Sequence, residues 1–262
     1  MKTFIMALLF GFNFLLSGAT ASAQPKTNPN FELYVLIGQS NMAGRGPLTD
    51  ELKQEGNDSV FVFNKQAQWI IARHPLHFDK PAIVGVGPGL MFGIEMAKAT
   101  PGKRIGLIPC AVGGTPIEHW LPGAFDSATN THPWDDAAAR ITRAMQYGTI
   151  KGVIWHQGEA NSNAAAAETY AVQLAALIHR IRTLAGNPNL PFVAGELGPF
   201  LATSGNINAQ LKKIPGLADH TAVAAAEGLT DKGDKLHFDA RSANELGKRY
   251  AARMLELQQR SN

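Results

Sequence analysis

The chain has a single cysteine, Cys110, among its 262 residues. An intrachain disulfide is therefore excluded, and the stability of the fold must come from its core rather than from cross-links. Cys110 lies in the apolar run IGLIPCAV, where we expect it to be a small buried hydrophobe.

The chain also lacks any long block of one charge. Its 24 Lys and Arg residues nearly balance 21 Asp and Glu residues, and no Lys/Arg-rich run occurs. This composition argues against nucleic acid and against an anionic membrane surface as partners. Beyond the first residues, no segment is apolar enough to span a bilayer, so we expect no stable membrane insertion. Internal repeats and long low-complexity tracts are absent as well.

The N-terminal residues have the pattern of a targeting segment. Lys2 precedes an apolar run over residues 4–16, and residues 21–23 read Ala-Ser-Ala, the form of a signal-peptidase site. We therefore predict a signal peptide at 1–23 and a single domain at 24–262, secreted or periplasmic. A transmembrane anchor is the alternative, but the apolar run is shorter than the roughly 20 residues that a bilayer needs.

Apolar strand-like runs alternate with helical patterns along the rest of the chain. The predicted strands cover residues 33–38, 59–63, 104–112, 152–158, 191–197 and 221–228. The predicted helices cover residues 89–100, 135–148, 163–186 and 239–259. Several strand runs are continuously apolar, as in strands covered on both faces. The alternation predicts an α/β fold of three layers, α/β/α, with a mostly parallel central sheet and with ligands at the carboxyl ends of its strands.

Four of these strand ends are followed by unusual polar segments. They are Gln39-Ser40-Asn41, GGTPIEHW (113–120), HQGEANS (156–162) and DKGDKLHFDA (231–240). A hydrolytic site needs a nucleophile, a base, an acid that orients the base, and donors for an oxyanion. Together the four segments contain residues of every one of these kinds.

Ser40, Asp234 and His237 form the first candidate set. Ser40 taken alone is most simply a helix cap, and its surroundings are not the G-x-S-x-G elbow of α/β hydrolases. Asp234 and His237 are three residues apart, so the carboxylate could hold Nδ1 of the imidazole and leave Nε2 free to take a proton from a serine. A surface aspartate and a partly packed histidine are the alternative.

The middle segments offer oxyanion donors. Gly113 and Gly114 allow backbone N–H groups to approach a ligand closely, although a tight turn would explain them too. Gln157 could donate from its side-chain amide, or it could be a buried amide that ties two loops together. Glu159 could orient the base or bind substrate, and an ordinary acid at a helix start is its alternative.

The segments GQSNMAGRG, GGTPIEHW, WHQGEAN and DKLHF resemble the four sequence blocks of the SGNH hydrolases. More narrowly, they resemble carbohydrate esterase family 6, which is acetylxylan esterase-like, and the sialate O-acetylesterase-like group. The blocks occur in family order and span residues 38–238. The resemblance implies a flavodoxin-like SGNH fold and a serine-dependent carboxylic ester hydrolase that removes acetyl groups from sugars or polysaccharides, with no metal and no other cofactor.

The resemblance also assigns roles to individual residues. Ser40 matches the nucleophile, His237 the general base and Asp234 the acid that orients it. The Ser40 N–H, the Gly114 N–H (preferred to that of Gly113) and the Gln157 amide match the oxyanion hole. Gln157 stands where many members of the wider superfamily have asparagine. Glu159 is the alternative acid.

Several residues near these blocks are candidates for contact with an acetylated carbohydrate substrate. They are Gln39, Asn41, Arg45, Glu118 and Trp120, with Trp134 and Trp155 as further rings on which a sugar could stack. Solvated loop charge is the alternative for Arg45 and Glu118, and core packing is the expectation for Trp155.

The sequence is compatible with three other functions. The first is a sialate O-acetylesterase. The second is a metal-dependent hydrolase, for which His74, His77, His156 and Glu159 are the candidate ligands. The third is a non-catalytic carbohydrate-binding protein on the same fold, which would need no paired serine and histidine. The sequence leaves the oligomeric state open.

Overall fold

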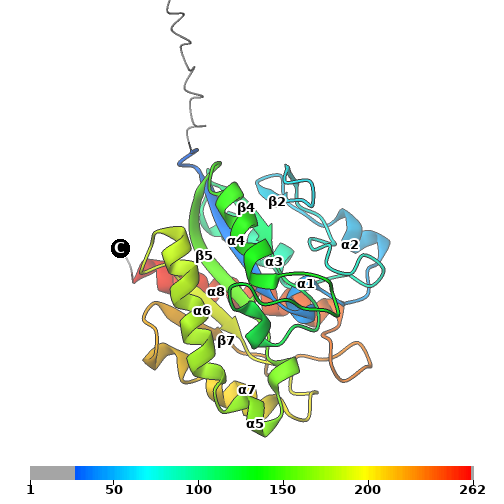
Figure 1. Cartoon of the computed structure of the whole chain (residues 1–262). Helices are drawn as coiled ribbons and strands as arrows, with labels where there is room; N and C mark the ends of the chain where they lie inside the picture. The colour runs from blue at the N-terminus through cyan, green and yellow to red at the C-terminus, as the bar shows by residue number, and fades with distance from the viewer. Residues whose placement is uncertain (1–26, 261–262) are drawn as a thin grey trace, which may run out of the picture.

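A computed structural model describes residues 27–260, so the predicted signal peptide at 1–23 lies outside the described residues. One sheet runs through the domain in the strand order β3-β2-β4-β1-β5-β6-β7 (Figure 1). Its strands are β1 (Phe31–Gly38), β2 (Val60–Phe63), β3 (Trp69–Ile71), β4 (Arg104–Pro109), β5 (Thr149–His156), β6 (Phe192–Gly195) and β7 (Thr221–Ala224). Neighbouring strands are parallel except β2 and β3, which are antiparallel.

Helices connect the strands and cover the sheet on both faces. The α-helices are α1 (Ser40–Ala43), α2 (Asp50–Gln54), α3 (Gly89–Ala99), α4 (Pro133–Ala144), α5 (Ala164–Ala167), α6 (Tyr170–Ala185), α7 (Ser204–Leu211) and α8 (Ala240–Gln259). Short 3-10 helices are η1 (Ile117–Trp120), η2 (Glu159–Asn161) and η3 (Ile214–Gly216). The predicted three-layer α/β/α architecture is confirmed.

The alternation of side chains along β1 explains the three layers. Successive side chains of a strand point to opposite faces, and all of those from Leu33 to Ile37 are buried. Leu33, Val35 and Ile37 pack in a core with residues of α4 and α6. Tyr34 and Leu36 pack in a second core with residues of α3 and α8. A continuously apolar strand is therefore required here, because β1 has no face exposed to water.

The connections reverse direction between β1 and β5. The chain leaves β1 toward β2, whereas it leaves β5 toward β6 on the other side of the sheet. Ligands of open parallel sheets bind at such a switch point, outside the carboxyl ends of the strands. The segments that begin at Gln39 and Gln157 follow these two strand ends.

The structure corrects several predicted elements. The single helix predicted at 163–186 is two helices, α5 and α6, separated by Glu168 and Thr169. Tyr170 at the start of α6 donates a hydrogen bond to the Gln157 carbonyl, and its hydroxyl accepts one from the Trp155 indole. These tertiary contacts fix where α6 begins. The strands predicted at 104–112, 152–158, 191–197 and 221–228 end earlier than expected, and β3, α2 and α7 were not predicted.

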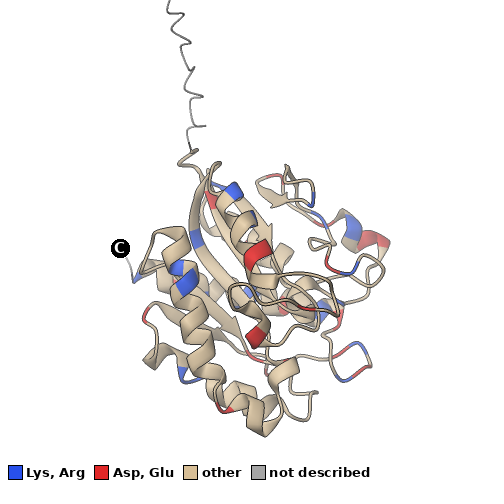
Figure 2. Cartoon of the chain, viewed as in Figure 1, with Lys and Arg blue, Asp and Glu red and all other residues tan. Residues whose placement is uncertain are grey.

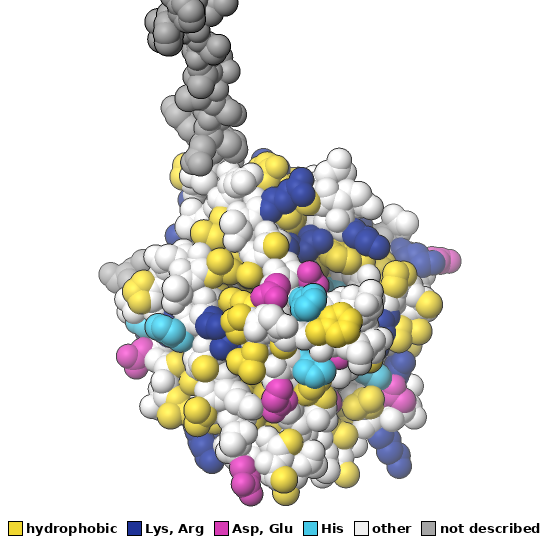
Figure 3. All heavy atoms as spheres, in the orientation of Figure 1, with side chains coloured by type: hydrophobic (Ala, Val, Ile, Leu, Met, Phe, Trp, Pro, Cys, Tyr) yellow, Lys and Arg dark blue, Asp and Glu magenta, His cyan; other side chains and the backbone are white. Residues whose placement is uncertain are grey.

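The surface of the described residues carries no dominant charge. Lys and Arg side chains are interspersed with Asp and Glu side chains around the domain (Figure 2). On the face shown in Figure 3, apolar side chains, histidines and charges of both signs are mixed. No helix among the described residues has the length and the apolar character to cross a membrane.

Gly38, the last residue of β1, lets the ends of the neighbouring parallel strands β1 and β5 lie close together. Its φ is +136°, and a Cβ atom there would lie 2.1 Å from the His156 carbonyl oxygen. The N–H of Gln39 donates to that same oxygen at 2.8 Å. Only glycine meets both the backbone angle and the space, so this residue sets how the Ser40 segment leaves the sheet.

We predict that Gly38→Ala lowers the free energy of unfolding by about 2 kcal/mol or more beyond Gly102→Ala. Gly102 is a matched control because its φ is also positive, +84°, but nothing lies within 4 Å of a Cβ there. Urea unfolding of the two variants measures the difference. Equal losses of stability in the two variants would show that the close approach of Gly38 to the His156 backbone does not restrict residue 38.

Candidate active site

Ser40 is the first residue of α1, directly beyond the end of β1. The helix cap is Gln39, and no side-chain capping bond is made, so the reading of Ser40 as a helix cap is wrong. Within the described residues, the Ser40 N–H meets no hydrogen-bond acceptor. The hydroxyl is left to contact a residue from the other end of the chain.

His237 is that residue. Its Nε2 lies 3.1 Å from Ser40 Oγ, and its Nδ1 lies 2.7 Å from Asp234 Oδ2. Asp234 Oδ1 accepts the backbone N–H groups of Leu236 and His237, so the carboxylate is fixed on both oxygens. With the Nδ1 proton donated to Asp234, Nε2 is the acceptor of the Ser40 proton. The structure thus brings together Ser40, Asp234 and His237 in the order that proton transfer requires.

The pKa values of His237 and Asp234 are both lowered from their ordinary values, which favours a neutral imidazole beside an ionised carboxylate. Burial lowers the pKa of His237, while the Asp234 carboxylate opposes that effect. Burial alone would raise the pKa of Asp234, but hydrogen bonds from the His237 backbone, the imidazole and the Leu236 N–H lower it well below its usual range. Near neutral pH, Asp234 is therefore ionised and His237 neutral.

Asn41 clamps the histidine segment to the serine segment. Its Nδ2 donates to the Leu236 carbonyl at 3.0 Å, and its Oδ1 accepts the Phe238 N–H at 3.1 Å. The two bonds hold the backbone on both sides of His237. Asn41 was predicted to contact substrate, but both ends of its amide are engaged within the protein and it is 4% exposed.

Glu159 is the third group that bonds to the Asn41 amide. Its Oε1 accepts a hydrogen bond from Asn41 Nδ2, and its Oε2 is buried without a partner among the described residues. Burial raises the pKa of Glu159 to about 7, although the Asn41 bond opposes that. His156 Nε2 is 3.6 Å away, but burial lowers the pKa of His156 to about 3, so the contact is not an ion pair.

The serine and histidine open into a cavity of about 400 Å³. Residues from all four polar segments line it, together with Arg45 and with two residues from 72–88, which lack helix and strand. The lining is Gln39, Ser40, Arg45, Lys80, Ile83, Gly113, Gly114, Glu159, Ala160, Leu236 and His237. Lys80 and Ile83 were not predicted, because an irregular segment gives no periodic signal that would place them at the site.

The two glycines of the second segment differ in their hydrogen bonding. The Gly113 N–H donates to Asp79 Oδ2 at 2.9 Å. No acceptor among the described residues meets the Gly114 N–H, and its φ is +92°. Of the two donors, the Gly114 N–H is the one that remains available to a ligand.

Two predicted site residues, Gln157 and Glu118, bond to other parts of the protein instead. Gln157 is fully buried, and its Nε2 donates to the Thr115 carbonyl and to Asn161 Oδ1, so the predicted oxyanion donor is instead an amide that ties two loops together. Glu118 accepts hydrogen bonds from Asn161 and Gln173 and does not line the cavity.

The tryptophan rings are also unavailable to a sugar. Trp120 is fully buried, its Nε1 donates to Thr115 Oγ1, and its ring packs edge-on against Trp155. The predicted core position of Trp155 is confirmed. Trp134 is 8% exposed and carries Arg180 over its ring. The buried position of Cys110 is likewise confirmed.

The candidate metal ligands do not assemble. In the part of the chain that the structure describes, no group of three or more His, Cys, Asp or Glu residues could hold a metal ion. His74 Nε2 lies 3.8 Å from Glu55, whereas His156 lies beside Glu159.

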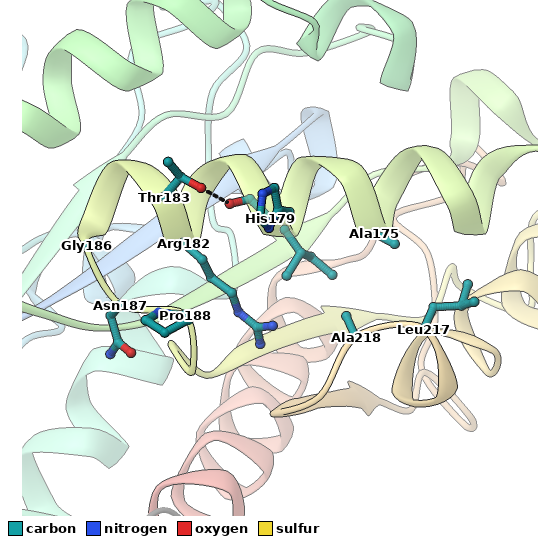
Figure 4. Close-up of a pocket in the computed structure, with 10 residues that line it drawn as sticks. Ala175, His179, Arg182, Thr183, Gly186, Asn187, Pro188, Leu217 and Ala218 are labelled. Carbon is teal, nitrogen blue, oxygen red and sulfur yellow. Dashed lines mark hydrogen bonds between the residues drawn. The ribbon is translucent and has the colours of Figure 1, made fainter.

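A separate hollow lies between the second half of α6, with the residues that follow it, and the residues before β7 (Figure 4). Arg182 crosses it and donates to the backbone carbonyls of Leu190, Asp219 and His220. Because its guanidinium bonds to the backbone of the protein itself, this hollow is a junction between elements rather than a second reactive centre.

Comparisons with solved structures place the fold among the SGNH-like hydrolases. The crystal structure of a protein from Arabidopsis thaliana matches with a TM-score of 0.75 and 29% identity, over 87% of this chain and 99% of that one. A carbohydrate acetylesterase from Xanthomonas citri matches with a TM-score of 0.68 and 21% identity, over 86% of this chain and 56% of that one, which supports the fold alone.

The sequence comparisons identify the family. Residues 30–256 match the model described as carbohydrate esterase, sialic acid-specific acetylesterase. A probable carbohydrate esterase of Arabidopsis thaliana is 30% identical over 239 residues, which cover 84% of this chain and 88% of that protein. The chain belongs to this carbohydrate esterase family.

We predict that the free energy of unfolding decreases as the pH rises, because of Glu159. Since its folded-state pKa lies near 7 rather than 4.5, the folded state keeps a proton that the unfolded chain releases, so the free energy of unfolding decreases between these values by up to about 3 kcal/mol. Glu159→Gln keeps the Asn41 contact and removes the titration. Urea unfolding at pH 4.5, 6 and 7.5 should show a pH-dependent difference between the two proteins, and parallel profiles would refute the raised pKa.

Proposed function

We propose that the protein is a carbohydrate O-acetylesterase that works by serine acyl transfer. The observation that carries the proposal is the hydrogen-bonded series Ser40 Oγ, His237 Nε2 and Nδ1, and Asp234 Oδ2, with separations of 3.1 and 2.7 Å at the wall of a cavity. A binding protein needs no such pairing of hydroxyl and base. Membership of a carbohydrate esterase family supports the reaction class.

In the first step, Ser40 Oγ attacks the acetyl carbonyl while His237 Nε2 takes the hydroxyl proton. The carbonyl electrons move onto its oxygen, which becomes an oxyanion. The free N–H groups of Ser40 and Gly114 are the donors that stabilise it. Asp234 stabilises the imidazolium that forms and holds its orientation.

In the second half of the reaction, the imidazolium returns its proton to the sugar oxygen. The bond between the carbonyl carbon and that oxygen breaks, so the sugar leaves as an alcohol and the acetyl group remains on Ser40. A water molecule then attacks the acetyl-serine, again losing its proton to His237. When this second oxyanion collapses, the bond between the carbonyl carbon and Ser40 Oγ breaks and the imidazolium returns its proton to Oγ, so acetic acid is released and the serine hydroxyl is restored.

The substrate class is an acetylated sugar or polysaccharide, with acetylxylan as the first candidate. The description of the matching family favours an O-acetylated sialic acid as the second. Gln39 and Arg45 line the cavity beside Ser40, which supports them as substrate contacts. Acetate release from acetylxylan and from O-acetyl sialic acid, measured side by side, separates the two.

The proposed place of action is outside the cytoplasm, in the periplasm or the medium. The basis is the signal-peptide pattern at residues 1–23, together with a substrate class found on polysaccharides. The N-terminal sequence of the protein recovered from culture would test this proposal.

We predict that Ser40→Ala lowers kcat for p-nitrophenyl acetate by at least about 1000-fold, because no other hydroxyl among residues 27–260 meets the His237 base. Ser204→Ala is the matched control, since Ser204 is 8% exposed against 7% for Ser40 and lies on α7. Circular dichroism confirms folding of both variants. Full activity in Ser40→Ala contradicts the nucleophile assignment.

We also predict that Asp234→Asn lowers kcat more than Glu159→Gln does. Asp234 contacts the imidazole directly, and its loss should cost about 100-fold or more, whereas Glu159 acts through Asn41 and its amide analogue should cost less than about 10-fold. Steady-state kinetics at pH 7 compares them. The reverse ranking would make Glu159 the acid that orients the base.

Wild-type protein that binds acetylated sugars but releases no acetate would instead support the non-catalytic alternative.

A further inference from the structure

A second cavity, of about 560 Å³, lies beside the proposed active site. It opens at the carboxyl ends of β2 and β4 and is bounded on one side by α4. Asp79 forms part of its wall, and the same side chain bonds to Arg45 and Gly113, which line the cavity that contains Ser40. The two cavities therefore share a wall.

Three cations line the second cavity: Lys65, Arg140 and Arg143. None of them takes part in an ion pair with a described residue, although Asp136 lies on the same lining. The charge of the other carboxylate, Asp79, is balanced by Arg45 at 2.6 Å. The cavity thus carries an excess of positive charge that an anion would offset.

Arg140 is held in place but is only partly satisfied. One terminal nitrogen donates to the backbone carbonyls of Phe63 and Asn64. The guanidinium lies over the rings of Phe63 and Phe78, at 5.5 and 4.6 Å from their centroids. Its remaining N–H groups meet no acceptor among the described residues. A planar guanidinium fixed in this way is preorganised for a carboxylate.

Two buried acceptors on the shared side of the cavity also lack donors. His77 Nε2 and Asp79 Oδ1 are buried and unpartnered within the described chain. The His77 ring bonds to the backbone of Leu36, so Nε2 is its unpartnered nitrogen. Because both atoms are buried, the acceptors on the lining that can meet hydroxyl groups of a ligand are those of Thr129, Thr131 and Asp136.

The remaining lining is apolar and suits the faces of a sugar ring. It includes the rings of Phe63, Phe78, Pro109 and Pro133 and the side chain of Val112. Cations, acceptors and apolar surface together define a ligand that has a carboxylate, hydroxyl groups and a ring.

We propose that the second cavity is a subsite for a sugar unit bearing a carboxylate, linked to the acetylated unit that lies at Ser40. The second cavity lies beyond the ends of β2 and β4, and the Ser40 cavity lies beyond the ends of β1 and β5. The midpoints of these two strand pairs are two strand spacings apart, about 10 Å, which sets the distance between the cavities. The assignment of a linked acetylated unit rests on the proposed function, whereas the binding of an acidic sugar does not.

The binding test uses glucuronate as the probe and glucose as its neutral match. Isothermal titration calorimetry of the wild-type protein should show glucuronate binding at least 10-fold more tightly than glucose. Arg140→Gln should weaken glucuronate binding at least 10-fold, and Ser40→Ala should leave it unchanged. Equal binding of the two sugars, or full binding by a folded Arg140→Gln protein, overturns the proposal.

Further variants guard against a folding defect in Arg140→Gln. Arg143→Gln removes an exposed cation of the same cavity that makes no bond within the described residues, and it should weaken glucuronate binding severalfold. Lys213→Gln, a surface change near η3, should have no effect. Equal effects of these two variants would show that only overall charge matters, and would overturn the site.

Kinetics then separate a subsite from an independent ligand site. Arg140→Gln should raise KM for an acetylated xylo-oligosaccharide that carries glucuronate and leave the turnover of p-nitrophenyl acetate unchanged. Glucuronate itself should not inhibit p-nitrophenyl acetate hydrolysis, and inhibition would place it in the Ser40 cavity instead. If the wild type binds glucuronate but Arg140→Gln leaves the KM for the oligosaccharide unchanged, the cavity binds a separate acidic molecule rather than a unit of the substrate, and the subsite proposal is overturned. Loss of all esterase activity in the wild type would refute the proposed function but not the calorimetric result.

Discussion

The arrangement of the site depends on one side chain, Asn41. Its amide bonds to the backbone on both sides of His237 and to the Glu159 carboxyl, so three segments that are distant in sequence meet at a single planar group. A carboxamide suits this place because it has a donor and an acceptor side by side. The 3.1 Å contact between Ser40 and His237 depends on these Asn41 bonds together with the close approach of the β1 and β5 ends at Gly38.

Much of the fold could be predicted because a doubly covered parallel sheet leaves a strong pattern. Each residue from Leu33 to Ile37 is apolar, since both faces of β1 are buried. The elements that escaped prediction are short or have weak propensity. β3 has three residues, and α7 reads SGNINAQL, with glycine and two asparagines. The break between α5 and α6 depends on tertiary bonds of Tyr170, which no local pattern encodes.

The predicted site residues fall into two groups, those that the structure brings together and those that it directs into the core. Ser40, Asp234 and His237 follow strand ends and converge there. Gln157, Glu118 and Trp120 have suitable chemistry as well, but hydrogen bonds to Thr115 and Asn161 direct them inward. Residue type and position in a loop do not determine which way a side chain points. Lys80 and Ile83 reach the cavity from an irregular segment, and only the folded chain brings them there.

The contact between Ser40 and His237 joins residues 197 positions apart in the chain. Contacts of such long sequence separation form late and slow the search for the native state. During synthesis the Ser40 segment emerges early, whereas the 231–238 loop emerges only shortly before α8. A nascent or truncated chain that lacks this loop has the serine without its base. Under the proposed mechanism, the protein therefore reacts with esters only after the 231–238 loop has been made and has folded against the Ser40 segment.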